Sequence, residues 1–207
     1  MDAHVTGVIL AGGQATRYGG RPKGLERVGG ARIIDRVAAA LRPVVDSLLL
    51  IANDPAADAW LPGVPVAADI EPGLGSLGGI RSAVARARGS ALVVAWDMPF
   101  VPSGLLAEIV RTAADGTADV VVPESGSRRG VEPLCAWYGP ACLPAIERAL
   151  AADDRRVVGF YDWVRVTHIP VAIVERFGDP AQIFLNINTA DDLATAEGTP
   201  GQAPDAT

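Results

Sequence analysis

The stretch from Leu10 to Leu25, LAGGQATRYGGRPKGL, combines five glycines with two arginines and one lysine in sixteen residues. Glycines let backbone amides approach an anion closely, and Arg17, Arg21 and Lys23 add charged donors that suit phosphate. Neither common phosphate loop is present, because the strand end lacks G-x-G-x-x-G and glycine, not serine or threonine, follows Lys23. We therefore expect a phosphate-binding loop of another kind, and we disfavour a Walker-type kinase and a nicotinamide oxidoreductase.

Two acidic residues and one asparagine come directly after short apolar runs. Asp97 follows SALVVAW, Asp69 follows VPVAA and Asn53 follows SLLLIA. A carboxylate at the end of a buried run costs free energy unless it is paired, hydrogen-bonded or metal-bound. Because Mg²⁺ beside a triphosphate uses one or two carboxylates, we predict that Asp97 binds this ion. The alternative is that Asp97 caps the helix that follows, although Ser103 fits that role better.

Two further segments have residue types that can bind a polar ligand. The glycine-rich stretch from Gly73 to Gly79 precedes a helical pattern, and it could hold a planar base against its backbone or form a tight turn. In FLNINTADDL, a predicted short strand places Asn186 and Asn188 on one face, ahead of a capping box of Thr189 and Asp192. Those amides could bind a polar ligand or a hydrated metal, or could only satisfy nearby backbone.

These candidates need a scaffold that brings the ends of several strands together. From VTGVILA to ADVVVP, apolar runs of strand length alternate with stretches of helical periodicity, with Gly, Pro or Asp at nearly every junction. Such alternation predicts an α/β fold with a mainly parallel sheet and helices on both faces. Ligands bind such sheets beyond the carboxyl ends of the strands, where the Gly12 loop, Asn53, Asp69 and Asp97 are expected.

The pattern changes after Pro123. VEPLCAWY alternates like a strand, GPACLPAIERALA and RRVVGFYDWV look helical, and RVTHIPVAIV is interpreted as a further strand. We expect this half to add mixed or antiparallel strands. Residues 1–196 are predicted to form one domain, and the tail 197–207, which is small, polar and rich in Pro and Gly, is predicted to be disordered.

Composition and charge restrict the class of protein. With 207 residues, of which 49% are hydrophobic, the chain can build one sizeable core. Its net charge of −6 argues against a broad nucleic-acid or anionic-membrane surface. The apolar runs fall far short of the roughly 20 residues of a membrane helix, and no basic start indicates a signal peptide, so we expect a cytoplasmic protein. Cys135 and Cys142 match no common zinc or redox spacing and are predicted to be small buried residues.

Four motifs, in order along the chain, resemble those of the nucleotidyltransferases that attach a nucleotide to molybdopterin, especially the molybdenum cofactor guanylyltransferases. The motifs are LAGGQATRYGGRPKG, AADIEPGLGSLGGI, WDMPF and NINTADDL, and the resemblance extends from about Val5 to Ala194. It implies a three-layer, Rossmann-like nucleotidyltransferase fold. It also implies transfer of GMP from GTP to molybdopterin with release of pyrophosphate, with Mg²⁺ as cofactor.

The same resemblance implies roles for individual residues. The residues expected to bind the nucleotide lie in the first loop and at the ends of later strands: Leu10, Ala11, Gly12, Gly13, Lys23, Asn53, Asp69, Gly79 and Asp97. Among them, Asp69 would help to recognise guanine and Asp97 would bind the metal. Catalysis would depend on Arg17, Lys23 and Asp97. The residues expected to face the pterin substrate are Arg17, Arg156, Asn186 and Asn188.

Three positions depart from the pattern of the family. Tyr18 replaces methionine, Pro22 stands where guanylyltransferases often have aspartate, and Trp96 replaces a small residue or cysteine. The open alternatives are the same chemistry with CTP or another phosphorylated acceptor, and a non-catalytic guanine-nucleotide-binding regulator. LAGG and GSLGG favour guanine over cytosine by the resemblance. Other cofactor-biosynthesis proteins and acceptor molybdoenzymes are the protein partners that it suggests.

Overall fold

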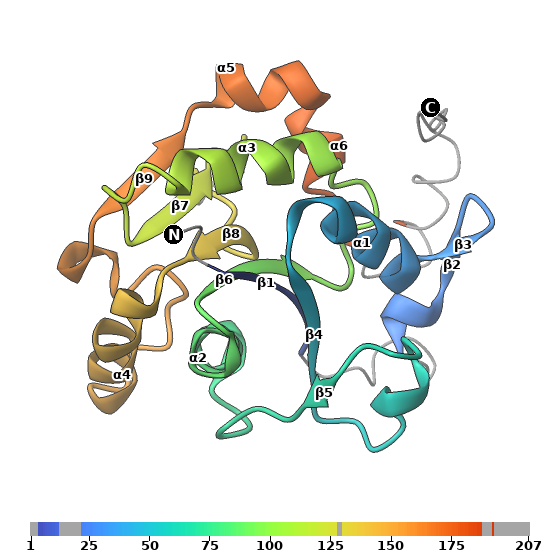
Figure 1. The fold of residues 1–207 in the computed structure, drawn as a ribbon, viewed down its shortest axis with the longest axis horizontal. Coiled ribbons are helices and arrows are strands. Elements are labelled where there is room, and N and C mark those ends of the chain that lie inside the picture. Colours follow the sequence, from blue (N-terminus) through green and yellow to red (C-terminus); the bar gives the residue numbers. More distant parts are fainter. Residues whose placement is uncertain (1–3, 13–21, 128–129, 188–191, 193–207) are drawn as a thin grey trace.

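The computed structural model describes residues 4–12, 22–127, 130–187 and 192. Seven strands form one sheet in the order β5-β4-β1-β6-β8-β7-β9 (Figure 1). They are β1 (Val5–Ala11), β4 (Ser47–Ala52), β5 (Val66–Ala67), β6 (Ser90–Ala95), β7 (Val120–Pro123), β8 (Cys135–Tyr138) and β9 (Val166–Ile169). Strand β8 is antiparallel to β6 and β7, and every other neighbouring pair is parallel. The predicted α/β fold, mainly parallel with a mixed second half, is confirmed.

Helices cover both faces of this sheet (Figure 1). On one face lie α1 (Ile33–Leu41), α3 (Ser103–Ala113) and the short α5 (Val171–Val174) and α6 (Pro180–Ile183). On the other face lie α2 (Gly75–Arg86) and α4 (Leu143–Ala151). A small hairpin, β2 (Arg27–Val28) with β3 (Ala31–Arg32), stands apart from the main sheet. The result is the three-layer arrangement that the sequence predicted.

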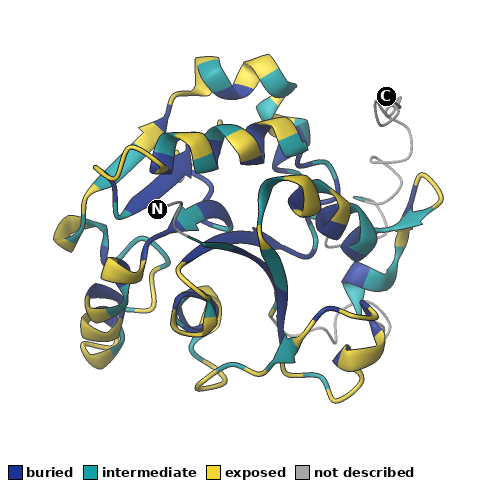
Figure 2. Ribbon diagram, viewed as in Figure 1, coloured by how far each residue is buried: buried dark blue, intermediate teal, exposed yellow. Residues whose placement is uncertain are grey.

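Strand β1 shows how the two cores are built. Because successive side chains of a strand point to opposite faces, Ile9 packs in the core under α1 and α3, whereas Val8 and Leu10 pack in the core under α2 and α4. Figure 2 shows the central strands buried and the outer surfaces of the helices exposed. Burial on both faces explains why the parallel strands are continuously apolar rather than alternating.

Local predictions in the second half are partly wrong. RRVVGFYDWV does not form a helix but contains turns and one 3-10 turn, Tyr161–Trp163; a Cβ on Gly159 would lie 2.8 Å from the carboxyl carbon of Asp154, where the chain turns. RVTHIPVAIV is a strand only as far as Ile169, because Pro170 has no N–H to continue the ladder, and α5 follows. Residues 185–187 are not a strand, since their backbone bonds go to α6 and to Asp97.

Predictions about capping, thiols and membrane association have mixed outcomes. Ser103 is the first residue of α3 and not its cap, which is Pro102, and no side chain caps that helix. Cys135 and Cys142 are buried free thiols as predicted, and burial raises the pKa of Cys142 to about 12. No helix in the described part of the chain is long and apolar enough to cross a membrane. The tail 197–207 and Thr189 lie outside the described residues.

Candidate active site

The order of the strands reverses at β1. From β1 the chain passes to β4 and β5 on one side and then returns through α2 to β6 on the other side. In open α/β sheets the crevice at such a switch point, beyond the carboxyl ends of the strands, is where ligands bind. Here β1 and β6 are paired with Leu10 opposite Ala95, and the Trp96 N–H donates to the Leu10 carbonyl at 3.1 Å. Gly12 and Asp97 therefore come from neighbouring strand ends, as predicted.

Asp97 is a partly buried carboxylate at this switch point. Burial raises the pKa of its carboxyl group, and the positive charge of Lys23 opposes part of that rise. The two predicted catalytic side chains, which are far apart in the sequence, are thus close enough to interact electrostatically. The Asp97 carbonyl also accepts the N–H of Ile187 at 3.0 Å, which brings the segment containing Asn186 to the same edge.

Lys23 is positioned by packing that the sequence did not suggest. It begins a 3-10 turn, Lys23–Leu25, and the next residue, Gly24, is buried against the indole of Trp96. A Cβ on Gly24 would lie 2.8 Å from Cδ2 of that ring. Trp96 in turn stacks on Trp60, with ring centroids 5.2 Å apart and planes 22° from parallel. The residue before Asp97 thereby fixes the turn that carries Lys23.

Replacing Gly24 with Ala is expected to destabilise the protein by about 1–3 kcal/mol, the usual cost of overpacking a filled site. The added methyl group would overlap the indole of Trp96, whose ring is also packed against Trp60. Urea unfolding followed by tryptophan fluorescence measures the change. Gly126→Ala is the matched control, because a Cβ there meets nothing within 4 Å. Equal midpoints for the two variants would contradict this packing.

A second group of predicted residues meets between β4, β5 and α2. The Asn53 amide donates to Oδ2 of Asp69 at 2.7 Å, and its Oδ1 accepts the Asp69 N–H at 2.8 Å. The other carboxylate oxygen, Asp69 Oδ1, is buried without a hydrogen-bond partner among the described residues. A Cβ on Gly79 would lie 4.0 Å from this oxygen and 3.4 Å from the side chain of Leu10. A buried acceptor without a donor costs free energy, which an N–H group of a ligand would relieve.

The second glycine-rich stretch is part turn and part helix. Gly73 and Gly75 have φ of +88° and +66°, values that favour glycine, and α2 begins at Gly75. Gly79 therefore lies in the helix next to Leu10 and Asp69, where an added Cβ would make only ordinary contacts of 3.4 Å and 4.0 Å. The Ser82 hydroxyl accepts the N–H of Ile70 at 3.0 Å and donates to the Gly78 carbonyl at 2.9 Å. This serine, which the sequence analysis missed, anchors the loop after Asp69 to the helix.

Comparison with known proteins decides the family. The family model of the MobA-like NTP transferase domain matches residues 7–166. The chain belongs to this family. A relative, the molybdenum cofactor guanylyltransferase of Desulfosudis oleivorans, is 36% identical over 198 residues, which cover 95% of this chain and 96% of the relative. The resemblance inferred from four motifs is thus confirmed.

Solved structures of similar proteins show the same fold as this member of the MobA-like family. Molybdopterin-guanine dinucleotide biosynthesis protein A from Archaeoglobus fulgidus has a TM-score of 0.77 and 28% identity, with 93% of this chain and 96% of that chain covered. Rv0371C from Mycobacterium tuberculosis, determined as a complex with manganese, has a TM-score of 0.66 and 21% identity, with 96% and 100% covered. At that identity the second likeness concerns the fold alone.

The remaining predicted residues of this MobA-like chain are placed less centrally or lie outside the described part. Arg156 is exposed on the turn after α4, and its guanidinium pairs with Asp154 at 2.7 Å, which lowers the pKa of Asp154 to about 2. Its neighbour Arg155 instead reaches the second glycine stretch, donating to the Gly73 carbonyl at 3.3 Å. Asn186 is partly buried, and its amide donates to the Phe184 carbonyl at 3.4 Å. The predicted residues outside the described ranges are Gly13, Arg17 and Asn188.

The carboxylate of Asp97 suits a metal ion that is also bound by the phosphates of a ligand. Within the described ranges, no three His, Cys, Asp or Glu side chains are grouped so that they could hold a metal. Asp97 offers one carboxylate, partly buried and at a strand end. Magnesium commonly binds through one or two carboxylates, phosphate oxygens of the substrate and several waters, so a single carboxylate such as Asp97 fits this mode.

Proposed function

We propose that this chain transfers GMP from GTP to molybdopterin, forming the guanine dinucleotide cofactor and releasing pyrophosphate. The observation that carries the proposal is the meeting of Asp97 and Lys23 at the switch point, beside the glycine-bearing end of β1. This placement suits a nucleoside triphosphate whose phosphates lie between a metal-binding carboxylate and an ammonium group. The names of the relatives support guanine and molybdopterin as the substrates.

The chemistry is an in-line displacement at the α-phosphorus of GTP. An oxygen of the terminal phosphate of molybdopterin forms the new P–O bond, and the bond between the α- and β-phosphates breaks. A phosphate monoester is already anionic near pH 7, so no protein nucleophile and no strong general base are required. The catalytic task is to position two anions against their repulsion and to stabilise the charge that passes to pyrophosphate.

The residues of the site divide that task between them. The backbone of Leu10 to Gly13 and the ammonium of Lys23 bind the phosphates, and Lys23 stabilises charge on the departing pyrophosphate. Arg17, with Arg156, Asn186 and Asn188, orients the acceptor. Asp97 would hold a divalent cation, Mg²⁺, which would neutralise charge on the phosphate oxygens when bound.

Asp69 provides the basis for choosing guanine. Its Oδ1 accepts no hydrogen bond from the described residues. Guanine presents adjacent N–H donors on its Watson–Crick edge, and a carboxylate can accept hydrogen bonds from them. Cytosine presents one amino donor beside acceptors, so it would leave the carboxylate poorly satisfied. Asn53 fixes this carboxylate through its amide, and Leu10 and Gly79 lie beside it.

Asp69→Asn is expected to lower the preference for GTP over CTP by about tenfold or more, since an unsatisfied buried group costs roughly 1–3 kcal/mol. The new amide presents donors toward the donors of guanine, whereas cytosine can accept from it. The measurement is kcat/KM with each nucleotide. Asp58→Asn, an exposed change of the same charge, serves as control. An unchanged preference would remove Asp69 from base recognition.

The test of the proposed function uses purified protein with Mg²⁺, molybdopterin and either GTP or CTP. Pyrophosphate release and the mass of the pterin product are measured together. A GMP adduct formed selectively is the expected result. A CMP adduct would instead make the chain a cytidylyltransferase. Tight GTP binding without pyrophosphate release would support a guanine-nucleotide-binding regulator.

The proposed product suggests protein partners for the enzyme. A guanine dinucleotide cofactor is useful only once it reaches an enzyme that holds it. We propose other cofactor-biosynthesis proteins and acceptor molybdoenzymes as partners, and we propose that the chain acts in the cytoplasm.

A further inference from the structure

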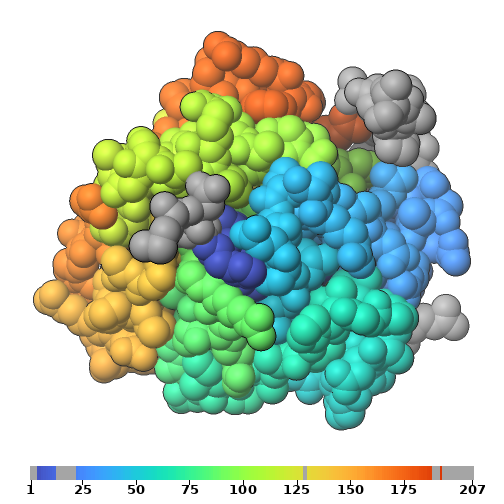
Figure 3. All heavy atoms as spheres, viewed as in Figure 1, coloured from blue at the N-terminus to red at the C-terminus, as the bar shows by residue number. Residues whose placement is uncertain are grey.

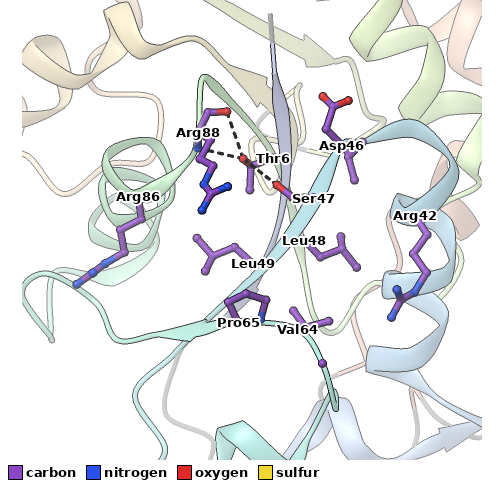
Figure 4. A pocket seen from close by; sticks show the side chains of 12 residues that line it. Thr6, Arg42, Asp46, Ser47, Leu48, Leu49, Val64, Pro65, Arg86 and Arg88 are labelled. Carbon is purple, nitrogen blue, oxygen red and sulfur yellow. Dashed lines mark hydrogen bonds between the residues drawn. The ribbon is translucent and has the colours of Figure 1, made fainter.

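A second pocket lies at the edge of the sheet opposite the candidate active site. Figure 3 shows this face, where the start of β1 is visible between the α1–β4 connection and the end of α2. The pocket, of about 530 Å³, opens beside the amino ends of β1, β4 and β5. Its apolar lining includes Leu48, Leu49, Val64 and Pro65 (Figure 4). Pockets of about 300–1,000 Å³ are typical of sites for small ligands.

Three arginines surround this apolar lining: Arg42, Arg86 and Arg88 (Figure 4). Within the part of the chain that the structure describes, their guanidinium groups make no hydrogen bond, ion pair or ring contact. Most other arginines of the described part are engaged, as Arg111 is by Glu108 and Arg148 is by the ring of Trp163, although Arg176 in the 3-10 turn Glu175–Phe177 makes no such contact. Arg42, Arg86 and Arg88 thus place three unpaired guanidinium groups at one pocket, in a chain whose net charge is −6.

The acidic residue in the lining does not neutralise these arginines. Asp46 accepts the N–H of Val5 at 2.8 Å and lies 3.9 Å from the ring of His4. In Figure 4 its carboxylate points away from the pocket. Arg88 therefore lies over the apolar surface without a carboxylate of its own, with Arg42 and Arg86 further out on opposite sides (Figure 4), an arrangement that attracts an anion.

The backbone at Arg88 is held firmly against the sheet. Its N–H donates to the Thr6 hydroxyl at 3.1 Å, and the Ser47 hydroxyl donates to the same oxygen at 3.5 Å. Gly89, with φ of +85°, packs so closely on the His4 carbonyl that a side chain would not fit. Arg42 and Arg86 stand at the carboxyl ends of α1 and α2, whose partial negative charge offsets part of theirs. Arg88 is therefore the rim cation with the most charge available to a ligand.

We propose that this pocket binds a small organic phosphate, with its phosphate at Arg88 and its apolar body on the lining of Leu48, Leu49, Val64 and Pro65. Guanidinium groups donate paired, charge-assisted hydrogen bonds to phosphate oxygens, and they do so better than ammonium groups. The site is distinct from the candidate active site, because β1 separates Thr6 at this edge from Gly12 at the other. The inference does not depend on the proposed function.

Phenyl phosphate, which joins one phosphate to one apolar ring, is the probe. Titration into ¹⁵N-labelled protein should shift the amides of Ser47, Gly63 and Arg88 in a saturable manner. Arg88→Ser should weaken binding at least tenfold, and the double change of Arg42→Ser with Arg86→Ser should weaken it several-fold. These side chains are exposed, so the variants should keep the wild-type Tm. Arg111→Ser, an exposed arginine elsewhere, is the matched control and should bind as wild type.

Further titrations test the parts of the proposal separately. Benzoate, which has a carboxylate in place of the phosphate, should bind several-fold more weakly than phenyl phosphate. Neutral benzyl alcohol should show no saturable binding. Raising the ionic strength should weaken phenyl phosphate binding, because exposed charges are screened. Equal affinity in Arg88→Ser and wild type, or shifts confined to amides near Asp97, would overturn the proposal. Tighter binding of an acidic peptide than of phenyl phosphate would also overturn it, in favour of a protein partner.

Discussion

Replacing Asp97 with Asn is expected to reduce turnover by about 10³-fold or more, because a metal at a phosphoryl oxygen contributes several kcal/mol of charge stabilisation. The amide would keep the shape of the side chain but lose the carboxylate at the switch point. Pyrophosphate release at saturating GTP and increasing Mg²⁺ measures the effect. Asp162→Asn, an exposed change of equal charge, should retain full activity. Near-normal turnover of Asp97→Asn at high Mg²⁺ would exclude the assigned role.

The same substitution is expected to leave the fold intact and to raise its stability at pH 7. Burial raises the pKa of Asp97 in the folded protein, so the fold favours the protonated carboxyl. That contribution to stability is fully present at low pH and is lost as the pH rises through the raised pKa. At pH 7 the ionised carboxylate therefore lowers the free energy of unfolding, and the neutral amide would restore it. The Tm should rise by roughly 2–4 °C for each kcal/mol restored. A lower Tm would assign Asp97 a structural role instead.

Lys23→Ala is expected to lower kcat by about 10²- to 10³-fold, the usual loss when one preorganised charge-stabilising donor is removed. The ammonium interacts with Asp97 in the folded protein, so it is placed to act on the same phosphates. Lys23→Met, which keeps the length of the side chain without its charge, should lose a similar factor. Single-turnover kinetics with GTP separates the chemical step from binding. A loss below tenfold in both variants would reduce Lys23 to a packing role.

Removing this ammonium should also move the pH dependence of the reaction. Lys23 lowers the pKa of Asp97 against the effect of burial, so the carboxyl should titrate at a higher pH in Lys23→Met. The acidic limb of the log kcat/KM profile is then expected to shift to higher pH. An unshifted limb would mean that the rate does not depend on ionisation of Asp97.

The elements of the sheet could be predicted because each is encoded locally. Continuous apolar runs such as SALVVAW are typical of strands buried on both faces, and their junctions carry Gly, Pro or Asp. The edge that gathers Asn53, Asp69 and Asp97 follows from parallel strands alone. Where RRVVGFYDWV was predicted helical, apolar spacing was outweighed by the turn at Gly159. Pro170 likewise ended β9 within an apolar run that looked like one strand.

Contacts between distant segments could not be predicted in this way. Gly24 packs on Trp96, which stacks on Trp60, so that three separate loops are joined. The local sequence of one loop does not indicate which other loops it contacts. The hydrogen bonds between Asn53 and Asp69 depend on β4 and β5 being neighbours, which periodicity does not determine. Arg42, Arg86 and Arg88 look in the sequence like solvated ends of helices, and only the fold gathers them.

The lysine that begins the turn against Trp96 is the one lysine of the whole sequence, since all other basic side chains apart from histidine are arginines. The protein thus has a single side-chain amine, and it lies beside Asp97. Acylating reagents and metabolites that attack amines would modify the folded chain at this position and at the N-terminus. A mass spectrum of peptides from the acetylated protein would therefore report the occupancy of Lys23 separately from that of the N-terminus.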